Sequence, residues 1–344
     1  MRKHTVLVLS IMAVFLISAL VVGCGSKEAE KPAAPAYPTK AINCLIGFAA
    51  GGPGDVIGRG ILPILQEKLG KGISISNQPG ASGATAGAEA LKGKDGYTML
   101  FGTETLSVWQ IMDLLNASPT KDFKVIKIVA SATPVLAVPP DSQFDDMKSF
   151  IEYAKANPEK LRIGTAGPAT VPHVSGLLLT KTLGAKFTFV PFQGGKPAVT
   201  AVMGGQVDAT IEMVNSMSEA YKAKQLKVLA TFTNEPVKGL EDVPQAGKIY
   251  PELAPQLPYG PYFGLFVSKD TPDDVVKILT AKMDEAVKDP RWAEYQNKLY
   301  IVPADISGQA AVDYLNKWTS NTAWTLYDMG VAKKSPADFG IPKP

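Results

Sequence analysis

The feature that most constrains this fold is an alternation of short apolar runs with helix-like segments, which continues through most of the chain. The apolar runs are rich in β-branched and aromatic residues and are bounded by Gly, Pro or Asp, which is typical of buried strands. Between them, residues such as Val275, Leu279 and Met283 repeat at helical spacing. This alternation predicts an α/β fold with mainly parallel sheets and helices on their faces. We expect strands at residues 42–48, 73–76, 98–101, 125–130, 135–138, 161–163, 187–190, 209–213, 228–232 and 263–267.

The length of the chain predicts two domains rather than one core. The chain has 344 residues, and single hydrophobic cores stop growing at about 250–300 residues. Two extended segments that contain prolines, at residues 129–140 and 244–261, have the character of crossovers between domains. They predict a first domain built from residues 37–135 and 258–344, with residues 136–257 forming a second domain inserted into it.

The first helical segment contains a proline, which predicts a break. Asp55 can cap a turn that runs to Ile61, whereas Pro63 inside a helix would cost about 3 kcal/mol. We therefore expect the chain to break at this point and a second helix to start at Pro63.

The N-terminus has the pattern of a secreted lipoprotein. Basic residues precede an apolar run at residues 6–22, and the small residue Gly23 stands directly before Cys24. This arrangement resembles a bacterial lipobox, which predicts a signal peptide at residues 1–23 and lipid on Cys24. An uncleaved membrane anchor is the alternative, because the run is near the minimum length for a spanning helix. Residues 24–36 are rich in Lys, Glu, Ala and Pro, so we expect a flexible tether that holds the body outside the cell membrane.

Charge and composition argue against several classes of function. The 35 Lys and Arg residues nearly balance the 32 Asp and Glu residues, and no basic run is present, so we expect no nucleic-acid partner. Cys44 lies in an apolar run, where a small buried residue is the simplest explanation. We expect no metal and no cofactor, because no Cys or His cluster is present. A secreted hydrolase would have to recruit His173, and the usual catalytic motifs are absent, so we do not expect an enzyme.

Three Gly-rich loops, at residues 48–55, 164–173 and 190–197, lie between expected strands and helices. Small residues let a ligand approach the backbone, and the helix that follows presents unpaired N–H groups and the positive end of its dipole. Such loops bind anions without a basic side chain. Any one of them can be a tight connection and no more, but three loops divided between two domains predict a shared cleft. The first loop approaches a dinucleotide fingerprint, but its glycine spacing is wrong by one residue.

The second loop leads into a helix that we expect Thr170 to cap and Pro172 to begin. His173 would then lie in the first turn of this helix. There it can form a hydrogen bond either with a ligand or with a neighbouring loop.

These loops, together with the segments between them, resemble one family: the substrate-binding proteins of tripartite tricarboxylate transporters, also called the Bug or TctC family. The resemblance implies a two-domain, periplasmic-binding-protein-like fold of type II that closes around a small mono-, di- or tricarboxylate. It also implies that backbone N–H groups and ordered waters hold the ligand. The motifs that carry it are residues 37–42, 48–52 with Asp55 and Arg59, 77–83, 95–98, 101–103, 154–158, 164–167, His173, 190–192 and 204–208.

The resemblance also implies which residues face the ligand. Asp55 is expected to brace its loop rather than touch the ligand, because its charge would repel a carboxylate. The implied site consists of Phe48, Ala49, Ala50, Gly51, Gly52, Gly54, Asp55, Thr103 and Glu104 in the first domain, and Thr165, Ala166, Gly167, Thr170, His173, Phe192 and Gln193 in the second.

Several residues depart from the family pattern. Members commonly have Pro at position 50 and Gly at position 53, where this chain has Ala50 and Pro53, and Pro53 removes a backbone donor from the first loop. Glu104 stands where small residues are usual; it can pair with an ammonium group of an amino-acid-like ligand, or be a solvated or capping loop residue. Glu212 presents the same alternatives. If both acids face the cleft, we expect a zwitterionic or cationic ligand.

The leading hypothesis is a monomeric, lipid-anchored extracytoplasmic binding protein that delivers a small carboxylate to the membrane subunits of a transporter. Domain closure around the ligand would signal that the site is occupied. The alternative is a ligand sensor that uses the same cleft to instruct a membrane receptor. Genes for membrane subunits next to this one would distinguish the two.

Overall fold

The computed structural model describes residues 37–257 and 259–344. Residues Pro38–Pro344 form one compact unit. The predicted signal peptide, the lipid on Cys24 and the tether lie outside the described residues. In the part of the chain that is described, no helix is both long and apolar enough to cross a membrane.

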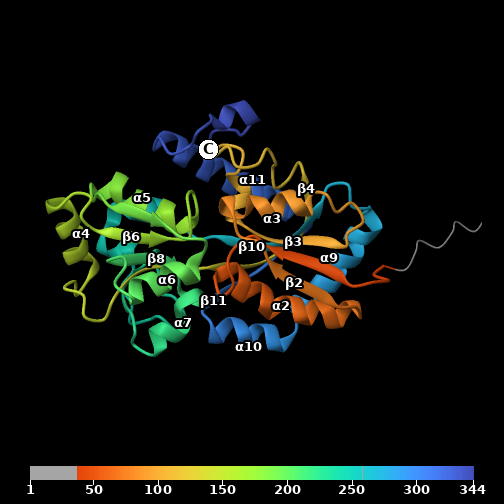
Figure 1. The fold of residues 1–344 in the computed structure, drawn as a ribbon, viewed down its shortest axis with the longest axis horizontal. Helices are drawn as coiled ribbons and strands as arrows, with labels where there is room; N and C mark the ends of the chain where they lie inside the picture. The colour runs from red at the N-terminus through yellow and green to blue at the C-terminus, as the bar shows by residue number, and fades with distance from the viewer. Residues whose placement is uncertain (1–36, 258) are drawn as a thin grey trace, which may run out of the picture. The chain divides into compact units, whose positions relative to one another are not determined.

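The described strands form two sheets (Figure 1). The strands are β1 (Ile42–Ile46), β2 (Ile73–Asn77), β3 (Thr98–Thr103), β4 (Phe123–Ala132), β5 (Pro134–Val138), β6 (Arg162–Thr165), β7 (Thr188–Pro191), β8 (Ala209–Met213), β9 (Lys227–Thr231), β10 (Tyr262–Ser268) and β11 (Ile301–Ile306). A six-stranded sheet has the order β11-β4-β10-β3-β1-β2, and a five-stranded sheet has the order β7-β6-β8-β5-β9. The chain passes from the first sheet to the second between β4 and β5 and returns between β9 and β10. The exact limits of the two domains stay a prediction.

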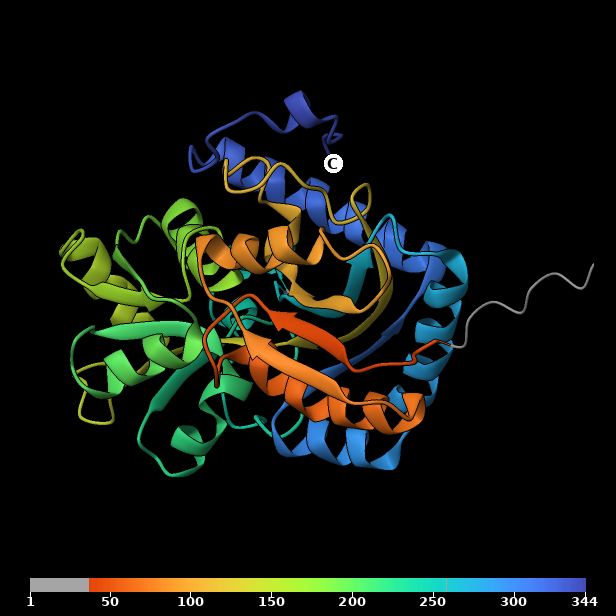
Figure 2. The same cartoon turned by 45° about the vertical axis from the view of Figure 1, so that its right-hand side comes forward.

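Helices cover both faces of each sheet. They are α2 (Pro53–Leu69), α3 (Ala84–Ala90), α4 (Met147–Ala156), α5 (Val171–Leu183), α6 (Gly195–Met203), α7 (Val214–Lys222), α8 (Ala246–Ile249), α9 (Asp273–Val287), α10 (Pro290–Lys298) and α11 (Gly308–Asp328). Short 3-10 helices are η1 (Ala81–Gly83), η2 (Glu104–Ser107), η3 (Pro251–Gln256) and η4 (Pro336–Phe339). Figures 1 and 2 show α3 and α11 on one face of the six-stranded sheet and α2, α9 and α10 on the other.

Each sheet packs against its own helices through buried apolar clusters. Leu100 and Phe266 belong to the cluster that joins the six-stranded sheet to α3 and α11. Phe150 and Ile211 belong to the cluster under α4, α5 and α8 in the five-stranded sheet, and Val199 belongs to the cluster under α6 and α7. A further buried cluster joins elements of the two sheets, because Val174 of α5 packs with Val108 and with Ala323 of α11. The ends of the strands and the loops beyond them are therefore supported by closely packed cores.

The sheets are mixed, which corrects the expectation that they are mainly parallel. Strand β1 pairs in parallel with β2 and β3, and β6 pairs in parallel with β7 and β8. Strands β4, β5 and β10 pair antiparallel with their neighbours. A parallel neighbour requires a crossover connection, usually a helix, and α2 supplies one between β1 and β2.

Helix α2 runs unbroken through Pro63, so the predicted break at this residue is wrong. A proline inside a helix costs about 3 kcal/mol, whereas burial of one large aliphatic side chain contributes about 1.5–3 kcal/mol. Pro63 itself is exposed, and the packing around it outweighs its cost. The neighbouring buried side chains are Ile61, Leu62, Ile64 and Leu65.

Candidate functional site

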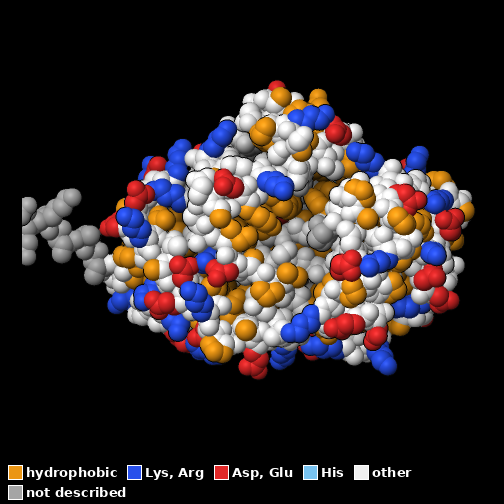
Figure 3. Space-filling model, turned by 180° about the vertical axis from the view of Figure 1, so that it is seen from behind, with side chains coloured by type: hydrophobic (Ala, Val, Ile, Leu, Met, Phe, Trp, Pro, Cys, Tyr) orange, Lys and Arg blue, Asp and Glu red, His pale blue; other side chains and the backbone are white. Residues whose placement is uncertain are grey.

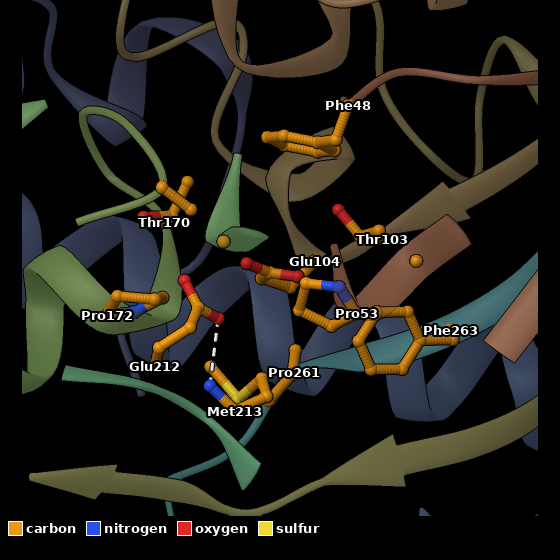
Figure 4. Close-up of a pocket in the computed structure, with 13 residues that line it drawn as sticks. Phe48, Pro53, Thr103, Glu104, Thr170, Pro172, Glu212, Met213, Pro261 and Phe263 are labelled. Carbon is orange, nitrogen blue, oxygen red and sulfur yellow. Dashed lines mark hydrogen bonds between the residues drawn. The ribbon is translucent and has the colours of Figure 1, made fainter. Parts of the chain in front are cut away.

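A cavity lies between elements of the two sheets, at the ends of their strands (Figure 4). About 340 Å³ of space, part of it open to solvent, lies between the lining residues. The six-stranded sheet and its helices contribute Phe48, Pro53, Gly54, Thr103, Glu104, Pro261 and Phe263, and the five-stranded sheet and its helices contribute Ala166, Thr170, Pro172, Gly195, Glu212 and Met213.

Glu104 reaches across the cavity from the six-stranded sheet to a helix of the other sheet. It begins η2 directly after β3, and it is only 5% exposed. Its Oε1 accepts a hydrogen bond of 3.2 Å from the backbone N–H of Val171, the first residue of α5. The glutamate thus occupies the helix start at which an anionic ligand was expected, and the helix dipole favours its charge there. Burial nevertheless raises the pKa of Glu104 to about 7.

Glu212 faces the same cavity from the end of β8 and is completely buried. Its Oε1 accepts a hydrogen bond of 2.8 Å from the N–H of Met213, whereas its Oε2 has no partner among the described residues. Burial, together with the nearby charge of Glu104, raises the pKa of Glu212 to about 8. Gly195 leaves room for this carboxyl, because a Cβ atom at that position would lie 2.6 Å from Cδ of Glu212.

The two carboxyls have no basic partner. None of the described lining residues is Lys, Arg or His, and no salt bridge within the described ranges includes Glu104 or Glu212. A buried carboxylate without a cation is costly, and the usual response is that the group keeps its proton. The site therefore holds two acids that change charge near neutral pH.

Asp55 braces the first loop from behind and does not line the cavity. It is 4% exposed, and its Oδ2 accepts a hydrogen bond of 2.8 Å from the N–H of Gly51. Its Oδ1 accepts bonds of 2.7 Å from Nε of Arg59 and 2.9 Å from Nδ2 of Asn77. Both oxygens of the Asp55 carboxylate thus accept hydrogen bonds that hold the loop. This agrees with the expectation that Asp55 braces the loop, because its charge would repel a carboxylate ligand.

The first loop has few backbone donors left for an anion. Besides Gly51, Gly52 donates to the carbonyl of Ala49 at 3.3 Å, and Ala49 donates to the carbonyl of Gln193 at 3.2 Å. Pro53, at the start of α2, has no N–H. The amide of Gly54, in the first turn of the helix, has no carbonyl one turn earlier to bind and lies at the cavity.

His173 holds the second loop rather than lining the cavity. Its Nδ1 accepts a hydrogen bond of 3.1 Å from the N–H of Ala169, which has a left-handed backbone with φ of 57°. Its ring packs edge-on against the ring of Phe189, with 4.9 Å between the two ring centroids. Burial lowers the pKa of His173 to about 4, so the ring is neutral at pH 7. Of the two alternatives, the structure contains the bond to the neighbouring loop.

Thr170 is the N-cap residue of α5 by position, but its side chain does not cap the helix, which corrects the predicted role. Its Oγ1 donates a hydrogen bond of 2.7 Å to the carbonyl of Gly167 instead. The hydroxyl therefore closes the loop before the helix, while Glu104 accepts from the helix start. The helix also begins one residue earlier than predicted, at Val171, with Pro172 second.

Further hydrogen bonds join the two sides of the cavity. Ser82 Oγ donates to the carbonyl of Pro168 at 3.0 Å, and Asn215 Nδ2 donates to the carbonyl of Pro53 at 3.5 Å. With the bonds that link Ala49 to Gln193 and Val171 to Glu104, these contacts hold the loops of both sheets together at the rim of the cavity.

The structure brings some of the predicted site residues together at the cavity and not others. Those that line it are Phe48, Gly54, Thr103, Glu104, Ala166 and Thr170. Those that lie in the loops without lining it are Ala49, Ala50, Gly51, Gly52, Asp55, Thr165, Gly167, His173, Phe192 and Gln193. The lining residues that the prediction left out are Pro53, Pro172, Gly195, Glu212, Met213, Pro261 and Phe263.

Four of the omitted residues had a signal in the sequence. Pro53, Pro172 and Gly195 belong to the three Gly-rich loops, and Glu212 was recognised as an acid at the end of a strand. Pro261 and Phe263 had no such signal. Phe263 belongs to β10 and Pro261 directly precedes it, far along the chain from the three loops, and only the order of strands in the sheet brings β10 beside β3.

The described residues contain no group of three or more His, Cys, Asp or Glu suited to a metal ion. Cys44 is completely buried in β1, and burial raises the pKa of its thiol to about 12, which leaves it unreactive.

On the face seen in Figure 3, basic and acidic side chains are interspersed, with apolar side chains gathered near the middle. This face carries no large area of one charge.

Comparison with known proteins gives consistent matches over most of the chain. The profile of the tripartite tricarboxylate transporter family receptors matches residues 57–322. A UPF0065 protein encoded in the tcbD-tcbE intergenic region of Pseudomonas sp. strain P51 is 28% identical over 286 residues, which cover 83% of this chain and 84% of that protein.

Solved structures match as well. One described as a periplasmic transporter is 28% identical with a TM-score of 0.81, over 87% of this chain and 100% of that one. MatC from Rhodopseudomonas palustris, solved with bound malate, is 24% identical with a TM-score of 0.78, over 84% of this chain and 100% of that one. These superpositions confirm the predicted two-domain, periplasmic-binding-protein-like fold.

Proposed function

The chain belongs to the tripartite tricarboxylate transporter family receptors, which are binding proteins of transporters and not enzymes, and from this membership we propose that it captures a small solute outside the cell membrane and delivers it to the membrane subunits of such a transporter. The observation that carries the proposal is the cavity between the two sheets, lined from both sides. In the proposal the chain acts as a monomer, anchored through lipid on Cys24.

The family supplies the starting expectation for the solute. MatC, with the same fold, was solved with malate, so a small carboxylate is the first class to consider. The amide of Gly54 and the hydroxyl of Thr103 are the donors in the cavity that support this expectation. The two glutamates are the feature that it does not explain.

Delivery requires that the membrane subunits distinguish the loaded receptor from the empty one. Four hydrogen bonds cross the rim of the cavity, and these bonds can break and form again with modest cost. An apolar cluster that includes Val108, Val174 and Ala323 also joins elements of the two sheets. A solute that touches both sides adds contacts that exist only when the sides are together, so it shifts the population toward the closed form.

Binding and delivery are tested separately. The chain without residues 1–24 retains the whole compact unit Pro38–Pro344, and it is titrated with mono-, di- and tricarboxylates, amino acids and amines by calorimetry. We expect one ligand to bind per chain and to be recovered unaltered. At 100 times its dissociation constant, the ligand should stabilise the fold by about 2.7 kcal/mol.

The outcome that contradicts the proposal is an absence of binding across all these classes, or recovery of a chemically altered ligand. The anchor is tested by Cys24→Ser in the full chain. This substitution should release the protein from the membrane fraction and leave its solute affinity unchanged, with the mass of the N-terminal peptide reporting the loss of lipid.

A further inference from the structure

The polar lining of the cavity is acidic, which is unexpected for a carboxylate site. Glu104 and Glu212 enter from opposite sheets, and Figure 4 shows both carboxyls directed into the same space. Oε2 of Glu212 is completely buried, has no partner among the described residues and points into the cavity. A buried, unpaired carboxyl oxygen is costly unless a donor from a ligand satisfies it.

Some of the donors that would hold a carboxylate in this space are already used or absent. The N–H of Val171 at the start of α5 already binds Glu104, and Pro172 beside it has no N–H. On the other side, the N–H of Gly51 binds Asp55, and Pro53 contributes no donor. A second carboxylate next to Glu104 and Glu212 would add repulsion without a basic side chain to offset it.

We propose that the solute of this receptor carries a cationic amino group, which lies between Glu104 and Glu212 and donates a hydrogen bond to Oε2 of Glu212. The proposal rests on the proposed function and changes the expected solute class from carboxylates to amines and amino acids. An ammonium group has three donors and no acceptor, so it can satisfy both glutamates at once.

Charge balance distinguishes two kinds of solute within this class. While the two acids share one proton, the pair carries a single negative charge, which one ammonium group neutralises. A zwitterion would place its carboxylate toward the amide of Gly54, on the side of the cavity away from the five-stranded sheet. A diamine carries two positive charges, so it would instead neutralise the two carboxylates when both are ionised.

The elements packed around the pair contribute few other groups that could titrate with it. From α5, His173 is neutral at pH 7 because burial lowers its pKa to about 4. From β10 and the segment before it, Tyr259 and Tyr262 have pKa values that burial raises far above neutral. Charged groups on neighbouring elements include Asp55, paired with Arg59 on α2, Lys196, exposed on α6, and Glu219 and Lys222, which form an ion pair on α7.

The test uses three four-carbon ligands that differ in their terminal groups: succinate, 4-aminobutanoate and 1,4-diaminobutane. Each is titrated by calorimetry into the chain without residues 1–24 between pH 6 and pH 8.5. Because the cation binds the ionised pair, affinity for 4-aminobutanoate should rise about tenfold from pH 6 to pH 8, and affinity for the diamine should rise more steeply. Titrations in buffers of different ionisation enthalpy should show that binding releases protons.

Two variants connect this effect to the glutamates. Glu212→Gln keeps the size of the side chain and removes its charge, so it should weaken binding of the amino compounds about 10- to 100-fold and flatten the pH dependence. Glu104→Gln keeps an acceptor for Val171 and should have a similar effect. Glu219→Gln is the matched control, because Glu219 lies on α7 with a side chain that is 79% exposed, and it should change nothing. Thermal melting of each variant confirms that it is folded.

Binding of succinate alone, amine affinity that falls as pH rises, or amine binding that survives both substitutions would overturn the proposal and leave the receptor function standing. An absence of binding by these three ligands and by the wider set of carboxylates, amino acids and amines would contradict the receptor function itself, and the proposal with it. Binding of 4-aminobutanoate or the diamine with the stated pH dependence, lost in Glu212→Gln, supports it.

Discussion

The buried acid pair predicts an unusual dependence of stability on pH. The perturbation is the double substitution Glu104→Gln and Glu212→Gln, which replaces both acids by neutral side chains of the same size. In the native chain the folded state binds protons at these two carboxyls more tightly than the unfolded state does. The stability that they contribute is therefore fully present below the unfolded pKa near 4.5 and is lost as pH rises through the folded values of about 7 and about 8.

The size of this loss follows from the two shifts. One pKa unit corresponds to about 1.4 kcal/mol, so raising the carboxyls from 4.5 to about 7 and about 8 lowers the free energy of unfolding on the order of 5 kcal/mol between pH 5 and pH 9. The double variant has no charge to bury and escapes this loss. At pH 5 the two proteins should differ by only about 1 kcal/mol, and at pH 9 the variant should be the more stable by an amount that corresponds to roughly 10 °C in melting temperature.

The assay is urea unfolding, followed by far-UV circular dichroism, of the ligand-free chain without residues 1–24 at pH values from 5 to 9. Only the difference between native chain and variant is interpreted, because other groups titrate in both. Glu219→Gln serves as the exposed control and should follow the native curve. Parallel curves for the native chain and the double variant would refute the reasoning, because they would mean that the buried acids are as well solvated in the folded state as in the unfolded one.

Three further predictions concern residues that the structure assigns to support rather than to ligand contact. Asp55→Ala should lower the free energy of unfolding by about 2–4 kcal/mol in urea, because it leaves the N–H of Gly51 unpaired and removes the partner of Arg59; Asp145→Ala, at an exposed acid, should change it by less than about 0.5 kcal/mol. His173, which is the only His once residues 1–24 are removed, should titrate near pH 4 by NMR, and a midpoint near 6.5 would contradict its burial. Cys44 should resist thiol reagents at pH 8 in the folded chain and react fully in urea, whereas rapid labelling of the folded chain would contradict its position in the core.

Most of the strands were predictable because their signals are local. The run at residues 209–213 matches β8 to the residue, and it is buried throughout. Strand β11 escaped detection because it lies at an edge of the sheet, contains Pro303, and buries only Ile301. A local pattern carries no information about neighbours, so the antiparallel pairing of β4, β5 and β10 could not be foreseen. Pro63 was misjudged for a similar reason, because the packing that tolerates it comes from other elements.

The parts of the site that are formed by loops and helix starts were predictable from the sequence. The three Gly-rich loops do lie around the cavity, and Asp55 braces the first of them as its charge predicted. The sequence could not decide between the alternatives for Glu104, because its partner, the N–H of Val171, lies 67 residues away and belongs to the other sheet. The ligand-facing roles of the loop residues stay predictions.

We propose that this chain is a receptor that holds a small solute between its two sheets. Native mass spectrometry of the chain without residues 1–24, purified without denaturation, tests this proposal. We expect one small molecule per chain, released unaltered on denaturation, carrying a basic nitrogen, and absent from Ala166→Phe, in which a bulky ring enters the cavity. A folded chain that retains the same molecule after this substitution would contradict the claim, because the solute would then be bound elsewhere.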